Sequence, residues 1–156
     1  MRELPHTLSC FVCGEANPLG LRLRFETDGQ VVRARFTPRP EHAGFKGVLH
    51  GGLLMTVLDE IMVWACAVQA RRFAFSAEMR TRFLRPARPH EPLTVTGELL
   101  ANRRGKIFEA KARVTNAAGE SLAEATGRYV PIQDADLPPM IGELVGDWQW
   151  LLDEAK

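Results

Sequence analysis

The sequence predicts an α+β fold in which an antiparallel β-sheet wraps around one long central α-helix. The helix is predicted over residues 53–70, where the only polar side chains are Thr56, Asp59, Glu60 and Gln69. A helix that is apolar nearly all round must be buried. The sheet is predicted by segments in which apolar and polar residues alternate, two before the helix and four after it. The helix and the apolar face of the sheet must both be shielded from water, and a sheet wrapped around the helix buries both surfaces against each other.

Length and composition indicate one compact soluble domain. The chain has 156 residues, of which 46% are hydrophobic and 25% are charged, with 20 Lys and Arg against 19 Asp and Glu. This near-neutral balance gives no indication of a nucleic-acid partner. The longest apolar run, residues 61–68, is far shorter than the roughly 20 residues that span a bilayer, and the N-terminus has no apolar core for secretion. We therefore expect a cytoplasmic protein with no membrane partner.

Residues 1–18 are predicted to form a turn-rich arm ahead of the first strand. The arm contains Pro5, the pair Cys10-x-x-Cys13 and an Asn-Pro step, all of which favour turns and loops. A structural zinc site needs about four ligands, and only His6 lies near the two cysteines in the sequence. The sequence therefore favours a packed turn over a metal site. The odd total of three cysteines also argues against a secreted disulfide framework.

The first two strands are expected as a hairpin before the helix. Leu21, Leu23 and Phe25 share one face of a segment over residues 21–26. An Asp-Gly turn then leads into the second alternating segment, residues 31–36.

Four further strands are expected after the helix. The first covers residues 73–85, and its predicted apolar face holds Phe75, Ala77, Met79, Thr81 and Phe83. The other three cover residues 93–100, 106–115 and 121–130, with loops between them that are typical of hairpins.

The strands and helix place the main domain at residues 19–131 and leave a C-terminal extension over residues 132–156. In this extension Trp148, Leu151 and Leu152 would share one face of a short amphipathic helix over residues 147–155. We expect the extension to dock on the sheet or on a neighbouring subunit.

Asp59 and Glu60 are the first candidates for a functional site, because they are adjacent carboxylates in an apolar helix. Burying an ionised carboxylate without a partner costs roughly several kcal/mol or forces its pKa up. For Asp59 this environment favours a functional role, and the alternatives are an ion pair with an Arg at a subunit interface or a partly solvated face of the helix. For Glu60 a structural ion pair is the simpler interpretation.

Three stretches carry a family resemblance: CFVCGEANPLGLRLRF, HGGLLMTVLDE and SAEMRTRFLRPA. With them the chain resembles the hotdog-fold acyl-CoA thioesterases of the PaaI-like group, over roughly residues 10–130. The resemblance implies a sheet that curls around the central helix, a homodimer with one continuous sheet, and dimers that stack as tetramers. It also implies hydrolysis of an acyl-CoA substrate without a metal or cofactor.

The resemblance also implies roles for individual residues. The catalytic carboxylate of the family, nine positions after the motif histidine His50, falls on Asp59, which would act as base or nucleophile. The oxyanion donor, the backbone N–H after that histidine, falls on Gly51, and His50 would shape the turn. The polar residue of the following strand falls on Ser76, which would orient the carboxylate or the attacking water.

Other residues are expected near the substrate. Gly52 and Glu60 flank the implied catalytic positions, and Arg85 and Arg82 are suited to hold the phosphates of coenzyme A. The chain departs from the family pattern at Gly44, where many members have an Asn that helps to position the substrate or water.

Helix geometry places a condition on this site. Gly51 and Asp59 are eight residues apart, about 12 Å along one helix, which is too far for both to act on one carbonyl. We therefore expect Gly51 of one chain to meet Asp59 of another across a two-fold axis. Two alternatives stay open: a hotdog hydratase or dehydratase acting on enoyl thioesters, and a non-catalytic acyl-thioester binding protein.

Overall fold

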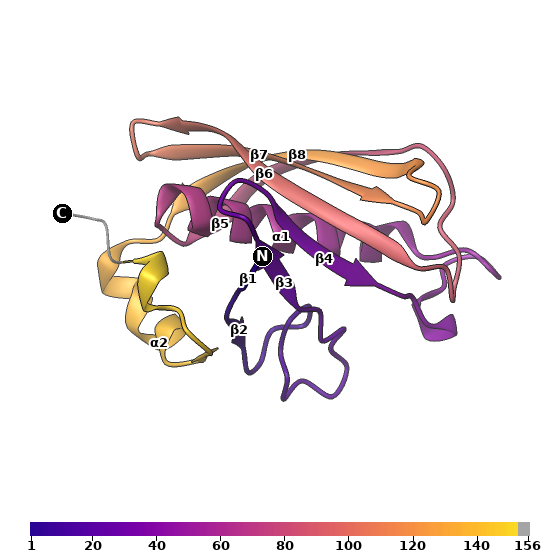
Figure 1. Ribbon diagram of the computed structural model, residues 1–156, viewed down its shortest axis with the longest axis horizontal. Coiled ribbons are helices and arrows are strands. Elements are labelled where there is room, and N and C mark those ends of the chain that lie inside the picture. The colour runs from indigo at the N-terminus through magenta and orange to yellow at the C-terminus, as the bar shows by residue number, and fades with distance from the viewer. Residues whose placement is uncertain (153–156) are drawn as a thin grey trace.

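A seven-stranded antiparallel sheet packs across one side of a single long helix in the computed structural model, which describes residues 1–152 (Figure 1). The helix is α1 (Gly51–Ala70). The strands run across the sheet in the order β1 (Arg2–Glu3), β3 (Phe25–Thr27), β4 (Val32–Phe36), β6 (Leu93–Arg103), β7 (Ile107–Thr115), β8 (Ser121–Pro131) and β5 (Ala74–Phe83). The predicted α+β arrangement is confirmed.

Helix α1 begins and ends at well-defined caps. His50 is the N-cap, and its side chain accepts a hydrogen bond from the Gly52 N–H. Arg71 ends the helix in the left-handed region, with φ 56°. By length and composition α1 could cross a membrane, but 56% of its most apolar window is buried inside this fold. The sheet that covers it accounts for its apolar character.

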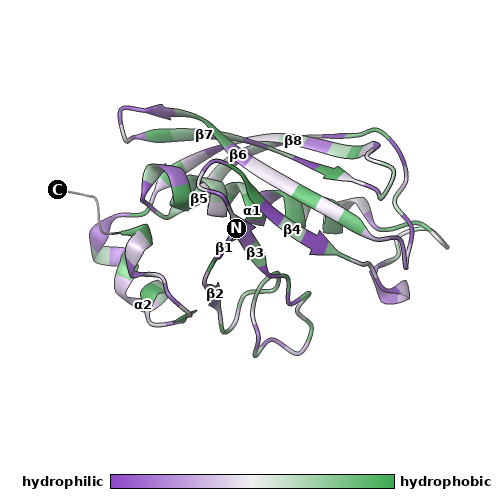
Figure 2. Cartoon of the chain, in the orientation of Figure 1, coloured by the Kyte–Doolittle hydropathy of each residue, from purple (hydrophilic) through white to green (hydrophobic). Residues whose placement is uncertain are grey.

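The core lies between α1 and the sheet. Figure 2 shows hydrophobic and hydrophilic residues alternating along the strands, as expected for a sheet with one buried face. Gly97 of β6 allows an especially close approach, because a β-carbon there would lie 3.0 Å from the carbonyl oxygen of Ile61 in α1. The largest fully buried side chains include Tyr129, Phe25, Phe108, Leu58, Ile61 and Met62.

The first predicted strand is shorter in the structure. Residues 21–26 were expected to pair within the sheet, but β3 begins only at Phe25. Arg22 has a φ of 54°, which interrupts an extended strand. The N–H groups of Leu21 and Leu23 instead donate to the carbonyl oxygens of Phe11 and Val12 in the N-terminal arm.

The predicted apolar face of β5 is wrong at its start. A β-bulge interrupts the β5–β8 register between Ser76 and Glu78, so the side chains change faces there. Ser76 pairs with the buried Tyr129 and faces α1, on the same side as Met79, Thr81 and Phe83. Phe75 lies on the outer face and is 58% exposed.

The C-terminal extension contains a helix, but at another position than predicted. The expected helix over residues 147–155 is replaced by the 3₁₀ turn η3 (Gln149–Leu151), and residues 153–156 lie outside the described part of the chain. The α-helix is α2 (Leu137–Ile141), which follows the 3₁₀ turn η2 (Asp134–Asp136). Pro138 lies in the first turn of α2, where its missing N–H costs nothing.

The extension docks on the N-terminal arm, on the end of α1 and, through Arg2 of β1, on the edge of the sheet. Strand β9 (Leu144–Val145) pairs with β2 (His6–Thr7) of the arm. Arg71 donates to the Trp150 carbonyl oxygen at 2.6 Å, and the Arg2 guanidinium lies 4.2 Å from the centre of the Trp150 ring. The two ends of the described chain therefore form one small layer beside α1 (Figure 1).

Candidate active site

Asp59 is held by two hydroxyl groups from the sheet. Its Oδ1 accepts hydrogen bonds from Ser76 Oγ at 2.7 Å and from Tyr129 OH at 3.0 Å. Within residues 1–152 neither hydroxyl contacts Oδ2, and no other side chain donates to it. The contact between Ser76 and Asp59 is the one expected from the sequence. The two donors orient the carboxylate and leave one oxygen for a water or a substrate carbonyl.

Tyr129 is a site residue that the sequence analysis missed. It lies in β8, 70 residues from Asp59 along the chain, and its side chain is fully buried. Burial, and then the nearby Asp59 carboxylate, raises the pKa of Tyr129 above its ordinary value, so the hydroxyl keeps its proton and donates. One signal was present: Tyr129 is the only tyrosine of the chain and follows Ala125 and Gly127 on the alternating inner face of a strand.

The N-terminus of α1 presents a backbone donor. The Gly52 N–H donates a hydrogen bond to His50 Nδ1 at 2.9 Å. Within residues 1–152 the Gly51 N–H has no acceptor. Phe83 of β5 lies over Gly51, with its ring 3.3 Å from the place of a β-carbon. The partial positive charge of a helix N-terminus favours an anion at this position. His50 thus shapes the turn, as expected, and Gly51 keeps a free donor.

Gly44, the departure from the family pattern, packs against the same turn. A β-carbon at Gly44 would lie 3.1 Å from the His50 Cα. The loop is closed by backbone hydrogen bonds from Gly44 N–H to Val48 O and from His50 N–H to His42 O, where His42 ends the 3₁₀ turn η1 (Pro40–His42). An asparagine in this loop would require the turn before α1 to move.

The expected ion pair of Glu60 is not formed within residues 1–152. Its Oε1 instead accepts a hydrogen bond from the Trp64 indole at 3.1 Å and lies 3.5 Å from Cys10 Sγ of the N-terminal arm. Burial, with a smaller contribution from Cys10, raises the pKa of Glu60 to about 8. Successive residues of a helix point about 100° apart. Glu60 therefore faces the arm, while Asp59 faces β5 and β8.

The two arginines expected to bind phosphate differ in their surroundings. Arg85 is half exposed, and it pairs with Glu120 at 3.1 Å and donates to the Ser121 carbonyl oxygen at 3.0 Å. Arg82 is exposed on β5 and forms no salt bridge within residues 1–152. Of the two, Arg82 is the readier to accept a phosphate, because Arg85 would first have to leave Glu120.

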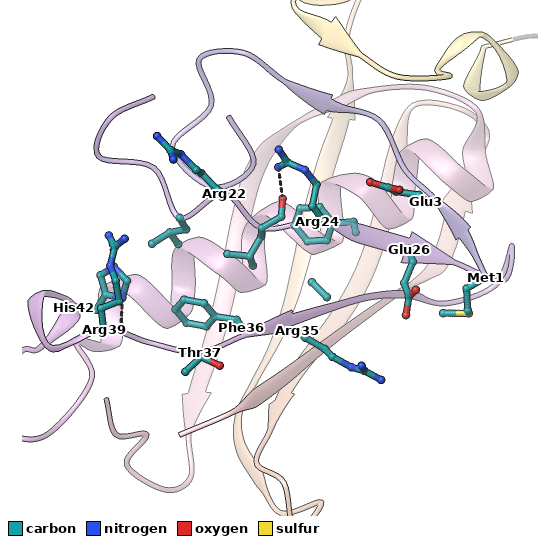
Figure 3. Close-up of a pocket in the computed structure, with 14 residues that line it drawn as sticks. Met1, Glu3, Arg22, Arg24, Glu26, Arg35, Phe36, Thr37, Arg39 and His42 are labelled. Carbon is teal, nitrogen blue, oxygen red and sulfur yellow. Dashed lines mark hydrogen bonds between the residues drawn. The ribbon is translucent and has the colours of Figure 1, made fainter. Parts of the chain in front are cut away.

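A separate depression of about 750 Å³ lies along β3, β4 and η1 (Figure 3). Figure 3 shows Arg22, Arg24, Arg35 and Arg39 around it. It contains none of the residues predicted for the site. The geometry of Asp59 and Gly51, rather than this depression, marks the candidate active site.

One chain alone brings together only part of the predicted site. Asp59, Ser76 and Tyr129 lie in contact, and His50, Gly51 and Gly52 form the start of α1. The eight-residue separation of Gly51 and Asp59 on one helix places these two groups about 12 Å apart.

Comparison with known proteins gives a consistent family signal. A sequence model of the thioesterase superfamily matches residues 46–123. Acyl-coenzyme A thioesterase 13 of Homo sapiens and of Pongo abelii is 29% identical over 90 residues, which are 57% of this chain and 63% of those proteins. The chain thus spans a little under two thirds of the length of these curated relatives.

Solved structures of related proteins have the same fold. The crystal structure of a thioesterase superfamily protein is 29% identical, with a TM-score of 0.72, over 78% of this chain and 59% of that one. The PaaI protein of E. coli, from a phenylacetic acid degradation operon, is 20% identical, with a TM-score of 0.66, over 72% of this chain and 81% of its own. These likenesses confirm the predicted hotdog-type fold.

Proposed function

The chain belongs to the thioesterase superfamily, and we propose that it is an acyl-CoA thioesterase that hydrolyses an acyl-CoA to a free acid and coenzyme A. The observation that carries this proposal is the oriented Asp59, whose Oδ1 is held by Ser76 and Tyr129 while Oδ2 has no donor within residues 1–152. An immobilised carboxylate with one free oxygen suits a base or a nucleophile. The name of the curated relatives, acyl-coenzyme A thioesterase, supports the substrate class.

In the proposed reaction Asp59 acts in one of two ways. As a base, Oδ2 takes a proton from water while the water oxygen bonds to the thioester carbonyl carbon; the C–S bond then breaks, and the leaving thiolate takes up the proton. As a nucleophile, Oδ2 bonds to that carbon and expels the thiolate, and water then hydrolyses the acyl anhydride. In both routes the charge that develops on the carbonyl oxygen is stabilised by Gly51 N–H at the helix N-terminus.

The proposed site requires two copies of the chain. Strand β5 is an edge of the sheet, and most of its side chains are exposed. An exposed edge strand is a ready partner for another strand. Pairing of β5 with its copy would extend the sheet, set the two α1 helices side by side, and bring Gly51 of one protomer to the substrate held by Asp59 of the other.

Release of thiol from acyl-CoA tests the proposal. We expect the wild-type chain to release coenzyme A from at least one member of a panel of short, medium, long and aryl acyl-CoAs. Asp59→Asn should lower kcat by about 100-fold to 10,000-fold, because the amide keeps the shape but cannot act as base or nucleophile. Asp134→Asn is the matched control, since it makes the same chemical change at an exposed residue of η2, outside the proposed site and the β5 edge.

Two outcomes would contradict this function. Near-normal turnover by Asp59→Asn, in a variant whose fold and unfolding midpoint match the wild type, would remove Asp59 from the mechanism. A loss of enoyl absorbance from an enoyl-CoA without thiol release would instead assign the chain to the hydratases.

A further inference from the structure

The N-terminal arm and α1 bring three metal-ligating side chains together outside the candidate active site. They are Cys10 and Cys13 of the arm and Glu60 of the helix. One ligand atom from each lies within 4.8 Å of the other two. Cys13 is fully buried, and Cys10 and Glu60 are partly buried. The sequence did not show this cluster, because β3, β4, η1 and the first half of α1 separate Glu60 from the cysteine pair.

The turn that contains the two cysteines directs backbone N–H groups toward one sulfur atom, Cys10 Sγ. The N–H groups of Val12 and Cys13 both point at Cys10 Sγ, at 3.2 and 3.5 Å. The turn is closed by a hydrogen bond from Gly14 N–H to the Cys10 carbonyl oxygen, and a β-carbon at Gly14 would lie 2.3 Å from that oxygen. Hydrogen bonds from surrounding groups hold the ligand atoms in place at metal sites.

The separation of two of the ligand atoms fits a zinc ion, and the third lies within 4.8 Å of both. In tetrahedral coordination, with Zn–S of about 2.3 Å and Zn–O of about 2.0 Å, a sulfur and an oxygen ligand lie about 3.5 Å apart. The distance from Cys10 Sγ to Glu60 Oε1 is 3.5 Å. Two thiolates and a carboxylate are a donor set that zinc accepts readily.

The three ligand atoms also lack a cationic partner. Within residues 1–152, Glu60 forms no salt bridge, its one nitrogen donor is the neutral Trp64 indole, and Arg24 donates to the Cys13 carbonyl oxygen rather than to a ligand atom. Groups that become anions are costly to bury together unless a cation accompanies them. A divalent ion placed between the three ligand atoms would supply that charge.

We propose that Cys10, Cys13 and Glu60 bind one zinc ion, which fastens the N-terminal arm to α1 beside the candidate active site. Three protein ligands leave the fourth tetrahedral position to a water molecule. Water reaches it because Cys10 and Glu60 are only partly buried. The ion would cross-link residues of the arm to the helix turn that carries Asp59.

Zinc binding to the full chain tests the proposal without any measurement of activity, so its outcome is independent of the proposed thioesterase function. The metal-free, reduced protein is titrated with Zn²⁺ in competition with a chromophoric chelator. We expect one Zn²⁺ per chain, with an affinity that Cys10→Ser lowers about 100-fold or more. Co²⁺ in the same site should give thiolate-to-metal charge-transfer absorption, and Cys10→Ser should lower its intensity at saturation, because only the Cys13 thiolate remains.

Two further variants keep the test decisive. Cys66→Ala is the matched control, because it removes a free, buried cysteine that belongs to no metal-ligand group among the described residues. It should leave the affinity for Zn²⁺ unchanged. Glu60→Gln leaves both thiols in place and should lower the affinity at least about tenfold, which covers the case in which Cys10→Ser fails to fold. Absence of zinc binding in the wild type, or equal affinity in the wild type, Cys10→Ser and Glu60→Gln, would overturn the proposal.

Discussion

Two neighbouring residues differ in chemistry because their carboxylate oxygens contact different groups. Asp59 and Glu60 are adjacent carboxylates on one helix, yet Asp59 meets two hydroxyl donors and Glu60 meets an indole and a thiol. The helical angle of about 100° between them sends one toward the sheet and the other toward the N-terminal arm. Environment, rather than residue type, separates the two roles.

The hydroxyl donors to Asp59 give a prediction at the residue scale. Tyr129→Phe keeps the buried ring and removes only the OH group. A hydrogen bond to a charged group contributes about 1.5–3 kcal/mol, so we expect kcat for acyl-CoA hydrolysis to fall about 10-fold to 100-fold if the bond positions Asp59 during the reaction. Steady-state thiol release measures kcat, and KM should change little because Tyr129 is buried behind Asp59.

Ser76→Ala supplies the companion measurement, since Ser76 donates to the same Oδ1. Each single variant should lose activity, and the double variant should lose more than either. If kcat of both single variants stays within about twofold of the wild type, which is a difference of only about 0.4 kcal/mol, the hydrogen bonds serve the fold and not the reaction.

The catalytic roles implied for Asp59 and Ser76 stay predictions, although the structure shows their side chains in contact. Sequence reasoning anticipated that contact through the family resemblance. It missed Tyr129 because that contact joins residues 70 positions apart and depends on how β8 packs against α1. It assigned an ion pair to Glu60 because nothing local shows that the two cysteines of the arm fold back onto the helix.

At the scale of helices and strands, the sequence predicted the element boundaries that depend on nearby residues. It did not predict which face of a strand is buried where the strand pairing is irregular. The end of α1 at Ala70 agrees with the predicted range of 53–70, and its start lies two residues earlier, because the His50 side chain caps the helix and Gly51 and Gly52 belong to its first turn. The face of β5 was wrong because simple alternation cannot show the extra residue of a bulge. In place of the helix expected over residues 147–155, the described part of that range forms only the 3₁₀ turn η3, because a shared apolar face does not by itself offset the cost of starting a short helix.

The close contact between β6 and α1 gives a prediction about stability. A β-carbon at Gly97 would lie 3.0 Å from the Ile61 carbonyl oxygen, and this backbone atom cannot move without shifting the helix. Replacing glycine by alanine restricts the unfolded chain and by itself stabilises by about 0.4–1 kcal/mol. Overpacking costs about 1–3 kcal/mol, so we expect Gly97→Ala to be destabilising on balance.

Chemical denaturation measures this free energy of unfolding. Gly142→Ala is the matched control, because its β-carbon would lie 3.5 Å or more from its neighbours and its φ is negative, and we expect a change within about 0.5 kcal/mol. A Gly97→Ala variant as stable as the wild type would show that the sheet and helix are less tightly packed than the structure indicates.

For the whole molecule, the length of α1 links the proposed catalysis to the proposed assembly. The proposed oxyanion donor, Gly51 N–H, lies at the first residue of the helix, and the Asp59 carboxylate lies about 12 Å further along it. Rotation of the Asp59 side chain cannot close that separation within one protomer, because the Gly51 N–H belongs to the backbone and is fixed at the helix start. The exposed edge strand β5 lies on the same side as Asp59, so pairing through it would assemble donor and carboxylate from two chains.

Complementation between inactive variants tests this shared site. Asp59→Asn removes the carboxylate, and Gly51→Pro removes the N–H at a helix position that tolerates proline. In a heterodimer one site has both defects and the other has neither. We therefore expect mixed subunits to recover activity, up to half of the wild-type value per heterodimer, as measured by thiol release after subunit exchange.

The steric effect of the proline ring needs its own control, because Phe83 lies over Gly51. Gly51→Ala adds bulk at the same place but keeps the N–H, so it should retain far more activity than Gly51→Pro if the donor is what matters. Both variants must first unfold at the wild-type midpoint. Proven subunit exchange without recovery of activity, or full activity in a demonstrated monomer, would show that one chain contains a complete site and that α1 does not set the assembly state.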